Sequence, residues 1–185
     1  MKVAVFCGSK TGNDPVYKEA TQRLGEYFAA RNVDIVYGGG HVGLMGVIAD
    51  SVLENGGKVY GVIPHHLESK EIAHQYLTEL TVVPGMHERK AAMSDMADAF
   101  VALPGGAGTL EEIFEAWTWA QLGYHQKPCA FFNVQGFYDP LFEMIQQMTE
   151  NGFTKSIHTD MLINTDSPEQ LMDAFQSYQP PKQKW

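Results

Sequence analysis

Short apolar runs alternate with longer amphipathic segments along the whole sequence. The apolar runs are rich in β-branched and aromatic residues and show little polar–apolar alternation, which is typical of strands buried on both faces. They predict strands near residues 2–7, 33–37, 58–63, 80–83, 99–103, 129–134 and 161–165. The segments between them predict helices near 15–31, 43–55, 86–97, 109–123, 138–150 and 167–177.

This alternation of strands and helices predicts right-handed βαβ crossovers. We therefore expect an α/β fold of the Rossmann-like, doubly wound type, with a mostly parallel sheet of about seven strands flanked by helices. The sequence contains no linker, repeat or low-complexity block, so residues 1–185 are expected to form a single domain.

The composition argues against several classes of function. The chain has 44% hydrophobic and 19% charged residues, ordinary values for a soluble globular protein. Its net charge of −9 argues against nucleic acid as a partner, because nucleic-acid binding requires basic surface. No apolar run reaches the roughly 18 residues of a membrane span, and the N-terminus does not look like a signal peptide. We expect a cytoplasmic protein in which Cys7 and Cys129 are buried free thiols.

Four predicted strand-to-helix loops contain unusual residues. They are 8–12 (GSKTG), 38–46 (GGGHVGLMG), 84–90 (PGMHERK) and 104–109 (PGGAGT). In doubly wound folds, ligands bind beyond the carboxyl ends of the strands, where such loops lie. All four loops are expected on one edge of the sheet.

The loop at 38–43 matches the pattern G-x-G-x-x-G of dinucleotide-binding proteins. It follows the second predicted strand rather than the first, and no acidic residue ends the third strand, where a ribose hydroxyl would be bound. Binding of NAD is therefore disfavoured. Two alternatives stay open: the glycines, including Gly39, allow close packing of helix and sheet, or they let a nucleotide approach the backbone.

Gly105, Gly106, Gly108 and Thr109 precede a predicted helix. Consecutive backbone N–H groups at a helix N-terminus favour an anion such as phosphate. The loop lacks the lysine of a Walker A motif. The alternative is a capping box, with Thr109 as the N-cap and Glu112 at the third helical position.

Arg89 and Lys90 follow the fourth predicted strand and could provide positive charge to a phosphate, although a solvated helix face is the alternative. His65, His66, His74 and His87 lack metal-site spacing and no Cys-x-x-Cys motif is present, so we expect no metal and no cofactor. Cys7 is interpreted as a packed thiol rather than a nucleophile.

Taken together, Pro104-Gly105-Gly106-x-Gly108-Thr109-x-x-Glu112 and the preceding Gly85-Met86-His87-Glu88-Arg89-Lys90 resemble the LOG family. These proteins are cytokinin riboside 5′-monophosphate phosphoribohydrolases, often labelled lysine decarboxylases. The resemblance covers nearly the whole chain, including Cys7-Gly8-Ser9 after the first strand and the glycine loop after the second.

The resemblance implies hydrolysis of the N-glycosidic bond of an AMP-like nucleotide, releasing free base and ribose 5-phosphate. It assigns Arg89 and Glu112 as catalytic residues. The implied substrate- and phosphate-binding residues are Gly105, Gly106, Gly108, Thr109, Lys90, Ser9 and Gly39. It also implies a nucleotide-binding domain in a homodimer with the site near the interface, without a metal or cofactor.

Cleavage of a glycosidic bond builds positive charge at the ribose C1′, and a carboxylate such as that of Glu112 can stabilise this charge. Decarboxylation is disfavoured, since no lysine has a recognisable setting for pyridoxal phosphate. Two other readings stay open: a non-catalytic nucleotide- or cofactor-binding carrier on the same scaffold, and a hydrolase for another nucleotide monophosphate. Residues 64–79 are expected on the base side of the pocket, where Glu71 is a candidate contact, and they leave the preferred base undetermined.

Overall fold

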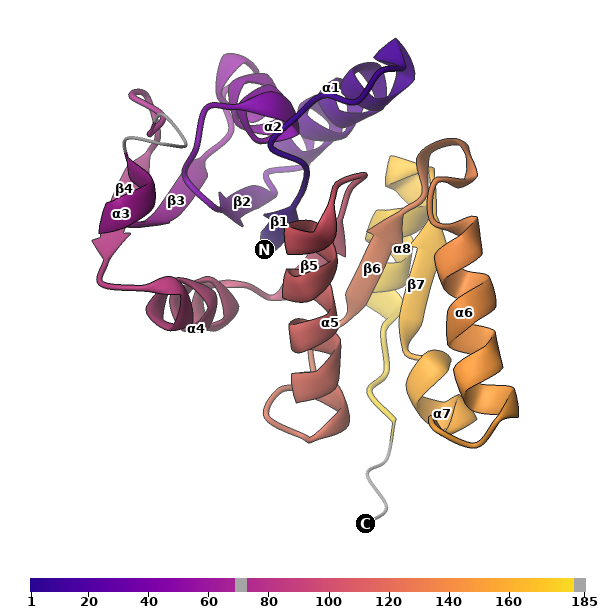
Figure 1. The fold of residues 1–185 in the computed structure, drawn as a ribbon. Coiled ribbons are helices and arrows are strands. Elements are labelled where there is room, and N and C mark those ends of the chain that lie inside the picture. The colour runs from indigo at the N-terminus through magenta and orange to yellow at the C-terminus, as the bar shows by residue number, and fades with distance from the viewer. Residues whose placement is uncertain (69–72, 182–185) are drawn as a thin grey trace.

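The computed structural model describes residues 1–68 and 73–181. Its centre is a sheet of seven strands in the order β4-β3-β2-β1-β5-β6-β7, and neighbouring strands pair in parallel throughout (Figure 1). The strands are β1 (Lys2–Phe6), β2 (Asp34–Tyr37), β3 (Val59–Pro64), β4 (Glu79–Val83), β5 (Ala99–Ala102), β6 (Cys129–Phe132) and β7 (Leu162–Thr165). The predicted fold class and all seven predicted strands are confirmed.

The helices cover both faces of the sheet. They are α1 (Pro15–Ala30), α2 (Gly43–Glu54), α3 (His65–Glu68), α4 (Met86–Met96), α5 (Ala107–Gln121), α6 (Asp139–Glu150), α7 (Ser156–Thr159) and α8 (Pro168–Ser177), with a 3₁₀ turn at Val134–Gly136. The six longer helices match the predicted ones. The two four-residue helices and the 3₁₀ turn were not predicted, because they are too short to show a helical period.

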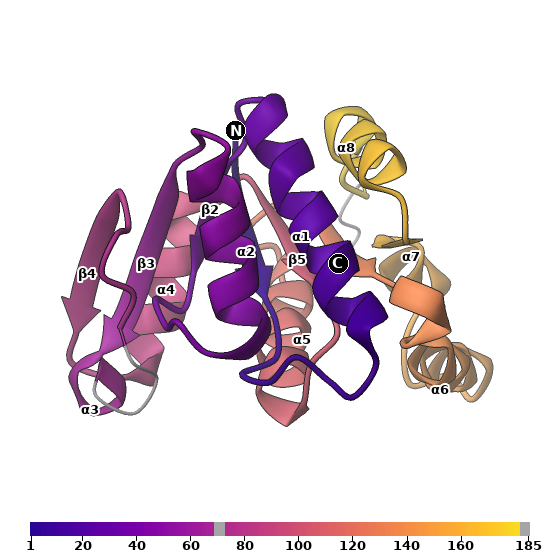
Figure 2. The same cartoon turned by 90° about the horizontal axis from the view of Figure 1, so that it is seen from above.

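Burial on both faces explains the missing polar alternation in the strands. Val3 and Val5 of β1 belong to the core beneath α1, α2 and α8, whereas Ala4 and Phe6 belong to the core beneath α4, α5 and α6. Figures 1 and 2 show these two layers of helices on opposite sides of the sheet. The inner strands therefore bury successive side chains on both faces, whereas the edge strands β4 and β7 are partly exposed.

Helix starts follow local rules. Asp14 caps α1 by accepting a hydrogen bond from the Val16 N–H, and Ser167 caps α8 in the same way through Gln170. Pro15 and Pro168 directly follow these caps, where the missing N–H leaves no helical bond unmade.

The chain reverses its winding between β1 and β5. After β1 it continues into α1 on one face, and after β5 it continues into α5 on the other. The loops that leave these adjacent strands meet at the edge of the sheet, where the Gly8 N–H donates to the Pro104 carbonyl at 3.1 Å. This switch point is where a doubly wound fold places its ligand.

Candidate active site

A cavity of about 250 Å³ opens at the switch point between β1 and β5. Its walls are the loop at 8–12, the segment Pro104–Gly106 and the side chains of Tyr17, Leu44 and Phe137. Ser9 lies in this wall, as the sequence predicts for a residue close to the ligand. Its contact with substrate stays a prediction.

The first turn of α5 differs from the predicted capping box. The helix begins at Ala107 with Gly106 as its N-cap, so Thr109 is the third helical residue rather than the cap. The assignment of Thr109 as N-cap and Glu112 as its partner is therefore wrong. Thr109 is instead 4% exposed. Its Oγ1 occupies the space beside Gly105 that a Cβ on residue 105 would need.

Gly106 and Gly108 occupy open space. An added Cβ at either position would have no described heavy atom within 4 Å, and both residues are exposed. Packing therefore does not require glycine at these two positions. Because the first N–H groups of a helix have no intrahelical acceptor, this bare first turn is suited to an anion.

Arg89 lies in the first turn of α4 and is only 4% exposed. Its guanidinium packs against Gly38 at the end of β2, where an added Cβ would collide with Nη2. Nη1 also lies 3.9 Å from the sulfur of Met86. The alternative that Arg89 belongs to a solvated helix face is therefore wrong.

Arg89 and Glu112 both act electrostatically on Cys7, which directly follows β1. Burial raises the pKa of the Cys7 thiol; the negative charge of Glu112 raises it further, and the positive charge of Arg89 opposes this. Both charges thus act on one buried sulfur, although they come from different helices. The thiol stays protonated at neutral pH, which argues against Cys7 as a nucleophile.

Lys90 points to a different set of partners. Its ammonium lies 2.7 Å from Glu111 and 3.1 Å from Glu115, both on α5. Partial burial would lower the pKa of Lys90, but the hydrogen bonds to these two carboxylates raise it. Lys90 therefore joins α4 to α5, and its predicted contact with phosphate stays a prediction.

Gly39 has a structural reason to be glycine. Its φ of 78° lies in the left-handed region, and an added Cβ would come within 3.0 Å of Leu80 Cδ1. Glycine is therefore required at this position by the backbone conformation and by packing against β3 and β4, not by contact between a helix and the sheet, and the two alternatives for the loop stay open. Its role in substrate binding stays a prediction.

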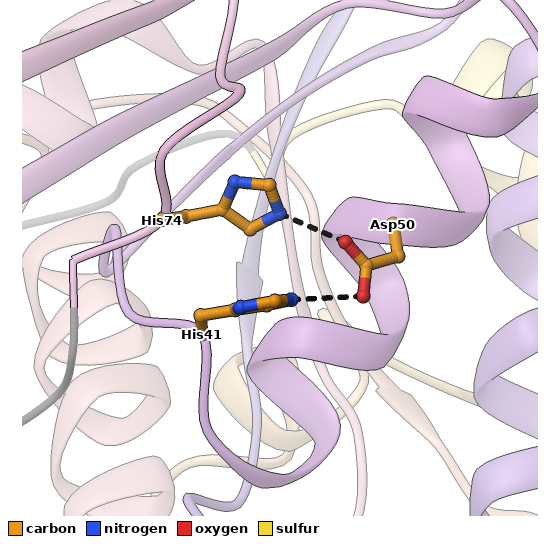
Figure 3. Close-up of side chains that lie close together, drawn as sticks. All are labelled: His41, Asp50 and His74. Atoms are coloured by element: carbon orange, nitrogen blue, oxygen red, sulfur yellow. Dashed lines mark hydrogen bonds and ion pairs between the residues drawn. The ribbon is translucent and has the colours of Figure 1, made fainter.

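One polar cluster beside this loop was not predicted. Asp50 of α2 accepts hydrogen bonds from His41 at 3.0 Å and from His74 at 2.9 Å (Figure 3). Their ligand-type atoms all lie within 4.8 Å of one another, which makes the trio a candidate metal group. His74 lies 24 residues from Asp50 in the sequence, and the trio matches no metal-site spacing, so the sequence contains no signal for it. Glu71 lies outside the described residues.

The chain matches known proteins over nearly its whole length. Residues 45–175 match the family model described as "Possible lysine decarboxylase". Two cytokinin riboside 5′-monophosphate phosphoribohydrolases of Arabidopsis thaliana are each 44% identical: LOG1 over 99% of this chain and 86% of its own length, LOG2 over 97% and 84%.

Solved structures share the fold. The Moco carrier protein from Chlamydomonas reinhardtii superposes with a TM-score of 0.69 at 17% identity, covering 95% of this chain and 94% of that one. At this identity the likeness extends to the fold alone. Among the residues that the structure describes, no helix combines the length and apolar character needed to cross a membrane.

Proposed function

Because the chain belongs to the LOG family, we propose that it hydrolyses the N-glycosidic bond of an AMP-like nucleoside 5′-monophosphate, such as AMP or a cytokinin riboside 5′-monophosphate, and releases the free base and ribose 5-phosphate. One observation carries the proposal beyond the family. The opposite charges of Arg89 on α4 and Glu112 on α5 both act on the buried Cys7 thiol, which directly follows β1 at the switch point.

The phosphate would bind at the first turn of α5. The N–H groups around Gly106 and Gly108 and the positive end of the helix dipole stabilise an anion there without a metal. Such an anchor fixes the ribose relative to Glu112, which lies three residues, about 4.5 Å of helix rise, beyond Thr109. Binding energy from the remote phosphate then aligns the reacting groups.

Glu112 would act on the ribose. As the C1′–N bond breaks, its electron pair leaves with the base and positive charge develops at C1′. A carboxylate stabilises that charge and accepts a proton from the water whose oxygen bonds to C1′. The departing base takes up a proton from solvent at the nitrogen that held the ribose, and Glu112 returns the proton of the attacking water to solvent, so that one water is consumed for each bond broken. Arg89, which stays charged at neutral pH, would clamp the substrate and orient Glu112.

The phosphate anchor is tested with AMP and adenosine side by side, following adenine release by chromatography. We expect hydrolysis of AMP and at least about a hundredfold lower kcat/KM for adenosine, the scale of a lost charge-assisted anchor. EDTA should change the rate little. Equal turnover of the two substrates would show that the phosphate is not bound as proposed.

The alternative is a carrier that binds a nucleotide or cofactor on the same scaffold without chemistry. The fold likeness to a Moco carrier protein does not favour it, since that likeness extends to the fold alone. Equilibrium dialysis that showed tight binding of AMP, with no adenine formed over hours, would favour the carrier. The presence of both Arg89 and Glu112 supports the enzyme.

We further propose that residues 1–185 form one nucleotide-binding domain, that the protein is cytoplasmic, and that two copies form a homodimer with the site near the interface. The family resemblance supports the dimer. Light scattering coupled to gel filtration would measure its mass, and a monomer that is fully active at nanomolar concentration would exclude a role for the interface.

A further inference from the structure

Asp50 connects two segments that are far apart in sequence. His41 belongs to the glycine loop after β2, whereas His74 belongs to the segment that leads into β4. Each Nε2 approaches a different carboxylate oxygen of Asp50, His41 at 3.0 Å and His74 at 2.9 Å (Figure 3). The His74 side chain is 1% exposed, against 43% for His41 and 44% for Asp50.

The tautomer of His74 argues against a metal in this cluster. Its Nδ1 accepts a hydrogen bond from the Tyr76 N–H at 3.1 Å, so the ring proton resides on Nε2 and is donated to Asp50. A metal on Nε2 would move that proton to Nδ1, directly against the Tyr76 N–H. Metal-bound histidines instead donate their second N–H to an acceptor. The cluster is therefore arranged as a hydrogen-bonded clamp.

The clamp fixes the outer side of the glycine loop. The His74 N–H donates to the Gly39 carbonyl at 3.0 Å, and Ala73 forms an antiparallel bridge with Gly40. The Tyr37 hydroxyl donates to the Gly40 carbonyl, also at 3.0 Å. The neighbouring Gly38 faces inward, against the guanidinium of Arg89. The loop thus lies between the clamp and a proposed catalytic residue.

We propose that Asp50 is a positioning residue for Arg89: through His41 and His74 it holds the glycine loop 38–41 in the place that sets the guanidinium. The inference rests on the proposed function for its kinetic consequence. Both carboxylate oxygens of Asp50 are engaged by the two histidines, so the proposed role of Asp50 is to position the loop and not to contact the substrate.

Asp50→Asn is the sharpest variant, because it conserves volume. An amide has one oxygen acceptor and one NH₂ donor, so it can accept from only one of the two Nε2–H groups and opposes the other. Its matched control is Asp173→Asn, on the exposed side of α8. His41→Asn is a second, milder variant because His41 is more exposed than His74.

We expect Asp50→Asn to lower kcat on AMP by between about tenfold and a hundredfold, the cost of a small misplacement of a catalytic group. KM should change by a smaller factor than kcat, because the proposed phosphate anchor lies on α5 and is not held by the clamp, so that only the contact of Arg89 with the substrate is weakened. His41→Asn should change kcat in the same direction by less. Asp173→Asn should match the parent in both constants.

A double-mutant cycle separates positioning from a general structural effect. In an Arg89→Lys background, Asp50→Asn should lower kcat by less than about a further twofold, because the group that it positions is already gone. Fully additive losses would overturn the proposal. So would micromolar binding of Co²⁺ or Zn²⁺ to the parent that Asp50→Asn abolishes, since the cluster would then be a metal site.

Failure of the proposed function would be recognised separately. A parent protein that hydrolyses no nucleotide excludes the hydrolase, yet the clamp can still be tested through the ¹⁵Nε–¹H NMR resonance of Arg89. That resonance should shift in Asp50→Asn and in His41→Asn, and should not shift in Asp173→Asn. An Arg89 resonance unchanged by both clamp variants overturns the positioning role, whatever the activity.

Discussion

The three glycines at the start of α5, Gly105, Gly106 and Gly108, differ in whether packing requires them. Gly105 is required by packing, because Thr109 Oγ1 occupies the space of its missing side chain. Gly106 and Gly108 face open space and are not required by packing. A sequence shows all three as equivalent, and only the packing around each residue separates the structural glycine from the two that leave backbone bare.

Glu112 gains a sharper test from the corrected helix start. Since Gly106 is the N-cap, Glu112 has no capping role, and Glu112→Gln should leave the start of the helix intact. The variant should melt close to the parent but lose at least about a hundredfold in kcat on AMP, the scale of losing a general base. Hydrolysis and thermal unfolding are measured on the same preparation.

The control for this variant is Glu111→Gln, one residue earlier and about 100° around the helix. Glu111 is largely exposed and pairs with Lys90, so its replacement removes a surface ion pair of small value. It should keep most of the activity. Equal losses in the two variants would show that any change on this helix turn impairs the enzyme, and Glu112 would lose its assigned role.

At the scale of elements, α5 begins two residues earlier than the pattern predicts. The predicted start relied on Thr109 as a polar cap, whereas the helix continues back through Gly108 and Ala107 to a glycine cap. Because glycine has a poor helix propensity, a helix start that contains glycine is not predicted from propensity. The earlier start places the N–H groups without an intrahelical acceptor at Ala107, Gly108 and Thr109, next to the proposed phosphate position.

Gly108→Ala tests this interpretation, because stability and function should change in opposite directions. Alanine in an open helical position gains up to about 1 kcal/mol over glycine, which raises Tm by roughly 2–4 °C in a protein of this size. The same methyl group would cover the bare turn and raise KM for AMP. A variant that is more stable and has an unchanged KM would place the phosphate elsewhere.

Helices and strands could be predicted where neighbouring residues in the sequence determine them. The strands follow from apolar runs and the longer helices from caps and periodicity, so both could be predicted from the sequence. The clamp could not be predicted, because His74 lies beside the glycine loop only through the Gly40–Ala73 bridge, which pairs two residues far apart in the sequence. Arg89 and Glu112 could be predicted through the family resemblance, whereas the burial of Arg89 against Gly38 required the structure.

For the whole molecule, the sheet divides the interior into two cores, and each core contains one cysteine. Cys7 lies in the core beneath α1, α2 and α8, and Cys129 lies in the core beneath α4, α5 and α6. Both are free and buried, as predicted. The two thiols can therefore report on how cooperatively the two sides of the sheet open.

We expect neither thiol to react with iodoacetamide in the native protein at pH 8, and both to react in urea. Burial raises the pKa of Cys129 to about 12, and burial together with the charge of Glu112 raises that of Cys7, so native thiolate is scarce.

A folded pKa above the ordinary value of 9.0 gives stability that is complete below pH 9.0 and declines as the pH rises above it. Unfolding free energy should accordingly fall less steeply above pH 9.0 in Cys129→Ala than in the parent. If Cys7 alone is alkylated under native conditions, the edge of the sheet at the active site opens independently of the rest, and the molecule does not unfold as one cooperative unit.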